Sequence, residues 1–402
     1  MITSLSWKNI WRSKRRSLVV IGAITTGVWA LIFIIAFYNS FDVAFLKNAI
    51  EHEYSHIQIH NPEYLQDANL SYSIEDAEKL MQMGESLPQV QAYSGRLLVD
   101  AMAASARNNA GAKVYGIDPT QEAATTQLDS QLVEGTYFEK VSRNPILISS
   151  KLAEKLSVKV RSKVVLTFQD VDRNITAASF RVEGIFKSKS PRINEGVLYV
   201  RQDDLARLTR QQYPHEIAYL LSGEEQISLV KEKLSYATEN EVRSFREIAP
   251  TFDLMEQSSS ATKQVLTVII MLALLFGIIN TMLMAVLERT HEIGMLRSIG
   301  MHRSRVFAMI MIETVLLSVV AGPLGVLLGF VTVRITGTQG IDMSMYQEAM
   351  SDFGLDPVFY PEIHSFTYFI LMVVVVFTAL LGSIYPAIKA IRINPLAAIR
   401  NH

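Results

Sequence analysis

The residues best suited to a specific interaction lie in one short charged segment, ERTHEIGMLRSIGMHRSR, at residues 288–305. This segment separates two long apolar runs, and it is too polar to remain in hydrocarbon and too short to form a domain. Read as a helix, it has one apolar face and several charged positions. The apolar face holds Ile293, Leu296 and Ile299, and the charged positions are Glu288, Arg289, Glu292 and Arg297. The pattern predicts a helix at the membrane surface that offers charges to a partner, or alternatively a basic loop that only fixes the topology.

The same segment contains its own stop signal. Gly300 is expected to end the helix, because glycine adopts the left-handed backbone conformation found after helix C-termini. Arg303 and Arg305 follow as a basic return into the next apolar run. A short helix with a defined end is therefore predicted.

The rest of the chain offers little that predicts catalysis. His52, His56 and His60 recur every fourth residue, which on a helix would align possible metal ligands. The residues from His56 onward alternate as in a strand, so we expect solvated histidines and no metal site. The sequence has no GxxxxGK[ST] motif. We therefore expect no cofactor on this chain, and any ATP to be used by another one.

The apolar residues are concentrated in four runs. The chain has 402 residues, of which 49% are apolar, with no cysteine and a formal net charge of −1. Residues 18–41, 263–287, 306–333 and 366–385 are each long enough to cross a hydrocarbon core of about 30 Å at about 1.5 Å per residue. These runs predict a helical protein of the lipid bilayer with four spans. Nothing in the charge indicates nucleic acid as a partner.

The distribution of Lys and Arg predicts the orientation, because basic residues are retained in the cytoplasm. Residues 1–17 and 386–402 carry several basic residues and no acid, whereas residues 334–365 are acidic. We therefore expect both termini to be cytoplasmic, the first as an amphipathic interfacial helix and the last as a tail. Residues 42–262 and the short loop at 334–365 are expected outside the cytoplasm.

The large outer segment, residues 42–262, is predicted to be an α+β domain. Its two ends each offer strand–helix–strand patterns that can close into one α/β sandwich. Between them, residues 120–212 are mostly strand-like and are predicted to form an inserted β subdomain, with a hairpin turn near residues 170–174. Ser73 and Asp76 resemble a capping box at the start of a helix.

Two polar residues within the predicted spans are costly to bury, Asn280 and Glu313. Glu313 has two possible roles: to pair with an arginine of the charged segment or of a neighbouring span, or to reach the inner headgroups as a brace. The third span also has residues that predict a kink and a close-packing face. These are Gly322, Pro323, Gly325 and Gly329.

Several of these segments together resemble the MacB/FtsX-type ABC transporter permeases. They are ERTHEIGMLRSIGMHRSRV, the following Ile312 and Glu313, the glycine-rich AGPLGVLLG and the terminal YPAIKAIRINPLAAIR. Four spans with a large insert after the first complete the likeness. It covers essentially the whole chain, and the layout is closest to the lipoprotein-releasing (LolC/LolE-like) permeases of the bacterial inner membrane.

The resemblance implies a dimer, of two like or two different permease chains, that works with two copies of a separate ATPase carrying ATP and Mg. The charged segment would dock into the ATPase as a coupling helix. The outer domains, in the periplasm, would move in response, without passage of substrate through the membrane. The implied contact residues are Glu288, Arg289, Glu292, Ile293, Leu296, Arg297, Gly300 and Arg303.

The resemblance leaves three functions open. Lipoprotein release, with a periplasmic carrier, is favoured by the chain length, the large outer domain and the second outer loop. The motif ERTHEIG looks closer to the efflux members, which expel peptides or drugs with a periplasmic adaptor. FtsX-like regulation of a cell-wall hydrolase is the third, although those members have smaller outer domains. An intramembrane enzyme is disfavoured, because the spans lack paired acids or a Ser/His arrangement.

Overall fold

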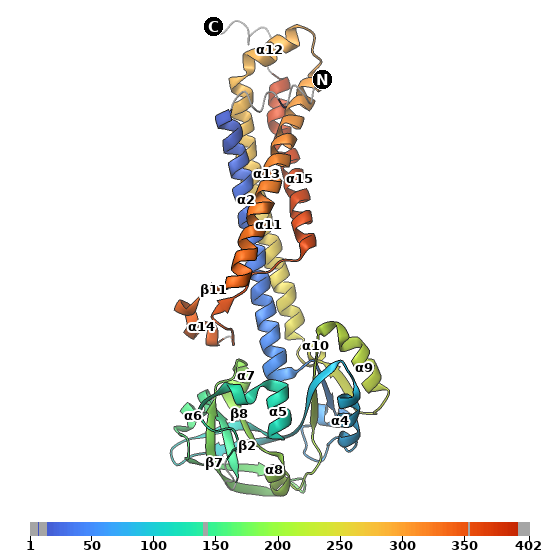
Figure 1. Cartoon of the computed structure of the whole chain (residues 1–402), viewed down its shortest axis with the longest axis vertical. Coiled ribbons are helices and arrows are strands. Elements are labelled where there is room, and N and C mark those ends of the chain that lie inside the picture. The colour runs from blue at the N-terminus through green and yellow to red at the C-terminus, as the bar shows by residue number, and fades with distance from the viewer. Residues whose placement is uncertain (1–6, 8–13, 140–143, 353, 393–402) are drawn as a thin grey trace. The chain divides into compact units, whose positions relative to one another are not determined.

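A computed structural model describes residues 7, 14–139, 144–352 and 354–392, which divide into two compact units (Figure 1). The helical unit comprises Met1–Asp42, Glu256–Asp342 and Val358–His402, and the large domain comprises Val43–Met255 and Met343–Pro357. Most of the expected interfacial helix at residues 1–17 and of the expected tail at 386–402 lies outside the described residues.

Within the described residues, four helices are long and apolar enough to cross a membrane. They are α2 (Lys14–Ala49), α11 (Thr251–Glu288), α13 (Arg303–Gln339) and α15 (Ser365–Ile391). All four extend beyond the apolar runs seen in the sequence, because hydropathy marks only the part suited to hydrocarbon while helical hydrogen bonding continues into the polar flanks. The helix α2 begins in the helical unit and ends in the large domain, and α11 runs in the opposite order.

Two glycines of α13 allow close packing against α2. A Cβ atom built on Gly325 would come within 2.6 Å of Val28, and one built on Gly329 would come within 2.8 Å of Ile32. Side chains at these positions would therefore push the two helices apart.

Gly322 and Pro323 do not belong to this contact. A Cβ atom on Gly322 would have only Met372 within 4 Å, at 3.9 Å, and Pro323 is exposed. The helix α13 continues through Pro323 without interruption. Of the four small or helix-breaking residues expected to matter, only Gly325 and Gly329 bring helices together here.

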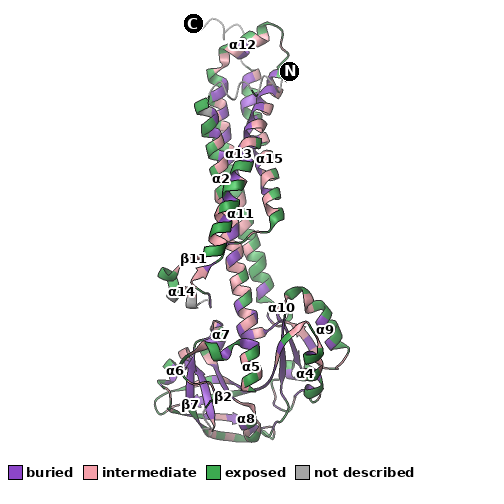
Figure 2. Cartoon of the chain, in the orientation of Figure 1, coloured by how far each residue is buried: buried purple, intermediate pink, exposed green. Residues whose placement is uncertain are grey.

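In the described part of the large domain, one sheet of ten strands forms the centre. Its order is β10-β1-β9-β2-β3-β8-β5-β7-β4, and β6 pairs with β2 and β7. The strands are β1 (Ile57–His60), β2 (Val90–Ala104), β3 (Asn109–Ile117), β4 (Leu132–Gly135), β5 (Pro145–Ser149), β6 (Lys163–Gln169), β7 (Ile175–Phe186), β8 (Val197–Arg201), β9 (Glu216–Leu221) and β10 (Glu241–Ser244). Figure 2 shows that much of the sheet is buried.

The strands expected to form a separate inserted subdomain belong to this sheet. The strand β8 pairs in parallel with β3, from Lys113 opposite Val197 onward, so the backbone hydrogen bonding is continuous across the predicted boundary. The sheet has one apolar core around Tyr219 and Val230 and another around Phe180, and the second also contains Leu97 and Val114, which precede the predicted insertion. The expected hairpin turn lies between β6 and β7.

Short helices cover the sheet and connect its strands. They are α3 (Pro62–Gln66), α4 (Ala77–Ser86), α5 (Pro119–Thr126), α6 (Ser150–Leu156), α7 (Pro191–Gly196), α8 (Gln202–Thr209), α9 (Ile227–Ser235) and α10 (Phe245–Ile248). The expected capping box at α4 is wrong. Asp76 is the N-cap residue and its side chain makes no cap, because its carboxylate accepts a hydrogen bond from Asn240 instead, at 2.8 Å.

The second outer loop is divided between the two units. The two-stranded sheet of β11 (Ile341–Asp342) and β12 (Val358–Phe359) closes it. The residues between these strands, with α14 (Gln347–Asp352), belong to the large domain. The Asn48 side chain donates to the carbonyl of Gly354 at 2.7 Å, so this loop is fastened to the last turn of α2.

Candidate functional site

The charged segment forms a short helix, α12 (Thr290–Ser298), between α11 and α13 (Figure 1). Gly300 has a φ of +99°, the Met301 N–H donates to the carbonyl of Leu296 at 3.0 Å, and the Gly300 N–H donates to the carbonyl of Arg297 at 3.1 Å. This pair of hydrogen bonds is a Schellman motif, in which a left-handed residue satisfies the last carbonyls of a helix. The sequence LRSIGM thus ends α12 at a fixed place.

The apolar residues of the segment do not share one environment. Ile293 is buried against the core of the helical unit and Leu296 is half-buried, but Ile299 is 85% exposed. The sequence placed all three on one face. Ile299 departs from that face because α12 ends at Ser298, and the chain turns at the following glycine. An exposed isoleucine therefore stands at the end of the helix.

Arg289 forms the joint between α11 and α12. It follows the last residue of α11 and is the N-cap residue of α12. Its Nη1 atom lies 3.1 Å from Oε1 of Glu313 on α13, and the two side chains are 14% and 9% exposed. The ion pair corresponds to the first of the two roles that the sequence left open for Glu313.

A cavity of about 270 Å³ lies beside this ion pair, between α11, α12 and α13. Apart from Arg289 and Glu313, its walls are mainly apolar side chains. They include Met282, Val286, Ile293, Leu296, Met309 and Ile310. Side chains next to unfilled volume lack contacts on one side, so α12 is less tightly packed here than a helix in a filled core.

A second arginine connects α12 to the last span. Arg297 Nη1 donates to the backbone carbonyl of Ile391 at 3.1 Å, at the final residue of α15. The short helix thus contacts α13 through its first end and α15 through its second. Of the predicted charged residues, Arg289 therefore contacts α13 and Arg297 contacts α15.

The remaining predicted residues are distributed over the surface and interior of the helical unit. Glu292 is half-buried on α12, whereas Glu288, Gly300 and Arg303 are exposed. Asn280 is exposed on α11 and lies outside the Arg289–Glu313 site. The two polar residues predicted within the spans are therefore not brought together.

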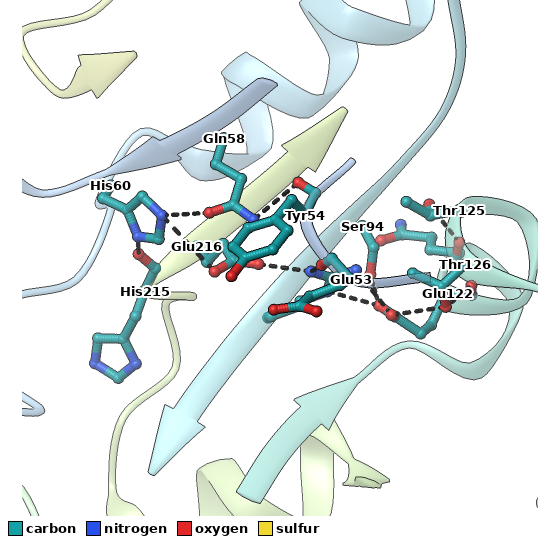
Figure 3. A network of polar contacts seen from close by, with 12 residues as sticks. Glu53, Tyr54, Gln58, His60, Ser94, Glu122, Thr125, Thr126, His215 and Glu216 are labelled. Atoms are coloured by element: carbon teal, nitrogen blue, oxygen red, sulfur yellow. Dashed lines mark hydrogen bonds and ion pairs between the residues drawn. The ribbon is translucent and has the colours of Figure 1, made fainter. Parts of the chain in front are cut away.

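A second polar cluster, which the sequence analysis did not predict, lies inside the large domain (Figure 3). Arg96 on β2 is fully buried, with Nη2 2.8 Å from Oε1 of Glu122 and Nη1 2.6 Å from Oε1 of Glu216. Arg96 Nε also donates to Glu122 Oε2 at 2.9 Å, so that carboxylate is held by two parallel hydrogen bonds. The sequence offers one signal for this cluster, because Arg96 and Glu216 are charged residues that each begin a strand-like stretch.

The charges in this cluster stabilise one another. Burial lowers the pKa of Arg96, but Glu122 and Glu216 outweigh it and the pKa is raised well above its usual value. Burial likewise raises the pKa of Glu216, but Arg96 and His60 outweigh it and the net pKa is lowered. Arg96 and Glu216 thus remain charged inside the domain, where an unpaired charge would be costly.

The cluster reaches the end of α2. A single π-helical turn, Ile50–Tyr54, follows α2 and leads into β1. Glu53 in this turn accepts hydrogen bonds from Ser190 Oγ and Arg192 Nε, and its backbone carbonyl accepts one from Arg96 Nη1 at 3.5 Å. The guanidinium of Arg192 lies 5.3 Å from the centre of the Tyr54 ring. The turn after α2 is thereby held on two sides.

The expectation that the three spaced histidines are solvated is wrong. His52, His56 and His60 are 5%, 7% and 5% exposed, and burial lowers the pKa of each. Their rings bond to different partners: Thr126 for His52, Leu221 for His56, and the carbonyl of His215 for His60. Within the described residues, no three His, Cys, Asp or Glu side chains are arranged to hold a metal ion.

Two protein families match the chain over most of its length. Residues 17–236 match the MacB-like periplasmic core domain, and residues 265–395 match the FtsX-like permease C-terminal domain. The second match contains α12, Arg289 and Glu313. The first contains Arg96, Glu122 and Glu216.

Relatives of the chain include ABC transporter permeases. An uncharacterized ABC transporter permease of Bacillus subtilis, YvrN, is 24% identical over 355 residues, which cover 81% of this chain and 85% of YvrN. The macrolide export ATP-binding/permease protein MacB of Escherichia coli is 43% identical over 56 residues, which cover 14% of this chain and only 9% of MacB.

Among solved structures, the periplasmic region of MacB from Actinobacillus actinomycetemcomitans is similar with a TM-score of 0.36 and 15% identity. That match covers 53% of this chain and 96% of the other. The four apolar helices and the large α/β domain describe a membrane protein with an extracellular domain. The chain belongs to the MacB/FtsX-type ABC transporter permeases.

Proposed function

We propose that this permease relays ATP hydrolysis by a separate ATPase to movement of its extracellular domain. The observation that supports this proposal is that α12 contacts α13 through Arg289 and α15 through Arg297, while Ile299 at its end is exposed. A docked partner that displaces α12 would therefore act on three spans together. In this proposal α12 and both termini are cytoplasmic, and two copies of the ATPase supply ATP and Mg.

The proposed movement begins at the Arg289–Glu313 joint. The neighbouring cavity gives α12 room to shift, and the ion pair would resist or redirect that shift at α13. The preceding residue, Glu288, ends α11, which is one uninterrupted helix from Thr251. A continuous helix is stiff along its axis, so it is suited to carry a displacement.

The proposed movement is received in the large domain at the turn after α2. Glu53 is bound by Ser190 and Arg192, and its carbonyl is bound by Arg96. Arg96 in turn pairs with Glu216 on β9 and Glu122 on α5. A displacement of α2 would thus be passed to the sheet through charge-assisted hydrogen bonds rather than absorbed by a loose linker.

For the cargo, we propose release of lipoproteins from the membrane to a periplasmic carrier. The support is the layout of the chain, with a large domain of more than 200 residues and a second outer loop fastened to it. Export of peptides or drugs with an adaptor is the second candidate, favoured by the 43% identity to a segment of MacB. Both cargo classes use the same relay.

The relay is tested at Ile299. The tagged permease is purified from its native membrane, the bound ATPase is identified by mass spectrometry, and ATP hydrolysis by the complex is measured. Ile299→Asp should weaken ATPase binding about tenfold or more, because a central apolar anchor in an interface is replaced by a charge. Tyr236→Asp in the large domain is the matched control, since both residues are 85% exposed.

Unchanged ATPase binding and hydrolysis in Ile299→Asp would contradict the relay proposal, as would an equal loss in both variants. The same purification separates the cargo classes. Acylated proteins or a soluble carrier among the bound proteins support lipoprotein release, and an adaptor with an outer-membrane channel supports export.

A further inference from the structure

One long strand of the large domain, β7, is paired along only part of its length on one side. The strand β6 covers its first side from Ile175 to Arg181, whereas β5 pairs with its second side only from Arg181 onward. In the part of the chain that the structure describes, no strand pairs with residues 175–180 on that second side. We propose that an extended acidic segment of a partner protein adds to this stretch, called here the β7 open edge, as a further strand.

The direction of the backbone hydrogen bonds shows which groups of the β7 open edge are available. The N–H of Arg181 donates to the carbonyl of Asn144, which immediately precedes β5, at 3.0 Å. Alternate residues of a strand direct their N–H groups to the same side. The N–H groups of Ala177 and Ser179 therefore point to the side on which β5 has not yet begun, and an added strand can accept hydrogen bonds from them.

Asn144 is the residue at which the pairing with β5 stops. It has a φ of +52°, which is left-handed, so the extended path of β5 ends at this residue. Its side-chain amide donates to the carbonyl of Ser179 at 3.2 Å. Asn144 thus satisfies one carbonyl of the β7 open edge and leaves the N–H groups of Ala177 and Ser179 to another partner.

An outer edge of the same sheet, β10, shows how strand addition is normally prevented. It has only four residues, and two of them, Glu241 and Arg243, are charged and pair at 2.8 Å. Short length and charged side chains protect edge strands from pairing with other chains. The β7 open edge has the sequence ITAASF, without charge, proline or glycine. It therefore lacks the features that keep another strand away.

The side chains beside the β7 open edge favour a partner segment with acidic and apolar residues. Lys163 on β6 lies directly opposite Arg181 on β7, and both are exposed. Like charges directly opposite each other in a sheet are destabilising, and neither side chain pairs with an acid among the described residues. A carboxylate near both cations offsets this repulsion. Val165 and Ile175, on the same face, are 40% and 78% exposed, so apolar side chains of an added strand extend that face.

A cavity of about 580 Å³ lies where the β7 open edge meets these cations. Its walls include Asn144, Lys163, Ser179, Arg181 and Leu208. A strand that ends in this cavity brings its terminal acidic side chain within reach of both cations. A free anion would use the cations alone, whereas an added strand also bonds to the backbone of Ala177 and Ser179. That difference separates the two kinds of ligand in an experiment.

The test selects peptides on the full permease in lipid nanodiscs. The probe is a display library of peptides of about nine residues, with Val or Thr at alternate positions and random residues between them. We expect the selected peptides to carry Asp or Glu at one end, and their affinity to fall about tenfold or more when Lys replaces these acids. Selection of uncharged or basic peptides, or of none, would overturn the proposal.

Methylation of the peptide backbone distinguishes strand addition from capture of an anion. Methyl groups on the nitrogens that face β7 should weaken binding about tenfold or more, because they remove donors to the strand. Methyl groups on the alternate nitrogens, which face away, should leave the affinity unchanged. Equal affinities of the two methylated peptides, with competition by inorganic phosphate, would show an anion site only and contradict strand addition.

Variants of the permease test the same contact from the other side. Ser179→Pro removes one N–H of the β7 open edge, at a position where an edge strand tolerates proline, and Ser179→Ala is the matched control that keeps this N–H. The selected peptide should bind Ser179→Ala normally and Ser179→Pro about tenfold more weakly. Unchanged binding to Ser179→Pro, or an equal loss in Ser179→Ala, would contradict the proposal.

A charge reversal does not depend on how well the proline variant folds. Arg181→Glu should reduce the preference for acidic over basic peptides about tenfold, whereas Arg107→Glu, the same change at another exposed site of the large domain, should not. An equal preference in both variants would remove Arg181 from the site and overturn the acidic character of the partner. ATP hydrolysis in the same nanodiscs reports separately on the relay, because the β7 open edge belongs to the large domain and not to α12.

Discussion

Among the described residues, Arg96 is buried against two glutamates and Arg289 is partly buried against one, and the two sites are built differently. Arg96 meets two carboxylates, with N–O distances of 2.8 and 2.6 Å, and its side chain is 2% exposed. Arg289 meets Glu313 at 3.1 Å, is 14% exposed and borders a cavity of about 270 Å³. The first site lies within a sheet, and the second lies at the joint between two helices.

The difference separates a fixed anchor from a site that can rearrange. Two carboxylates around Arg96 hold the guanidinium from different elements, so movement of any one of them breaks a charge-assisted hydrogen bond. The Arg289 site has longer contacts and free volume beside it. A relay needs both kinds of site: one that changes when the partner moves α12, and one that passes the change on without deforming.

The largest effect is expected from Arg96→Met. Removing the guanidinium leaves two buried carboxylates without a counter-charge, which typically costs about 3–5 kcal/mol. Hydrogen exchange of β2 and β9 in the purified full chain should increase strongly. Arg181→Met, an exposed change in the same sheet, is the control and should stay within about 0.5 kcal/mol.

The reason for that loss can be checked by rescue. Neutralising the two acids in the same chain, with Glu122→Gln and Glu216→Gln added to Arg96→Met, removes the uncompensated charges. Partial recovery of protection is expected, because isosteric neutral replacement of a buried ion cluster is tolerated better than removal of one partner. A triple variant less protected than Arg96→Met would show that side-chain shape, rather than charge, dominates the cluster.

Acidification should affect the large domain through its buried histidines. Burial lowers the pKa of His215 to about 4 from 6.5. Its Nδ1 accepts from the Leu98 N–H at 3.1 Å and its Nε2 lies 3.0 Å from the Leu70 carbonyl. Protonation of Nδ1 would place its N–H against the N–H of Leu98, so two donors would face each other. The folded state therefore binds fewer protons than the unfolded state, and stability is lost as the pH falls from about 6.5 toward 4.

For His215 alone, the loss between pH 7 and pH 5 is about 2 kcal/mol. His52, His56 and His60 act in the same direction, because their pKa values are also lowered. Hydrogen exchange at β2 should therefore report lower stability at pH 5, after correction for the intrinsic exchange rate. His215→Gln should reduce this pH dependence, and a domain equally stable at both values would contradict the argument.

Sequence patterns predicted most of the helices and strands. Four apolar runs indicated the four long helices, and alternation from His56 onward indicated β1. The boundaries of the long helices were harder to predict, because hydropathy does not mark how far a helix continues beyond the hydrocarbon core. The pairing of β3 with β8 was also hidden, because strand pairing depends on residues far apart in the sequence.

The candidate sites were predicted to different degrees for a physical reason. The α12 segment is local, so its charges, its apolar positions and the Gly300 stop are visible in one stretch of sequence. For Glu313 the sequence left two roles open, pairing with an arginine or reaching the inner headgroups, and the structure pairs it with Arg289. The Arg96 cluster joins β2, α5 and β9, and no local pattern connects residues 96, 122 and 216.

A smaller effect, on ATP hydrolysis rather than on stability, is expected from Glu313→Gln. The amide fits the same space, so the spans should remain folded, but the charge attraction to Arg289 is removed. Stimulated ATP hydrolysis by the purified complex should fall about tenfold, equivalent to about 1.4 kcal/mol. Ser318→Ala, another buried polar change on α13, is the control. Full stimulation of ATP hydrolysis in Glu313→Gln would show that the Arg289–Glu313 ion pair takes no part in the relay.

The smallest effect on stability is expected for an ion pair that has the same N–O distance as Arg96 and Glu122 but is exposed to solvent. Arg210 lies 2.8 Å from Asp172, the same N–O distance as Arg96 to Glu122, but these side chains are 69% and 57% exposed. Asp172→Asn should change stability by less than about 1 kcal/mol, because water already solvates both charges. Hydrogen exchange of β6 and β7 measures it. A loss of stability as large as that of Arg96→Met would mean that distance, rather than burial, determines the strength of these ion pairs. The contrast between the Arg96 site and the Arg289 site would then rest on the cavity beside Arg289 alone.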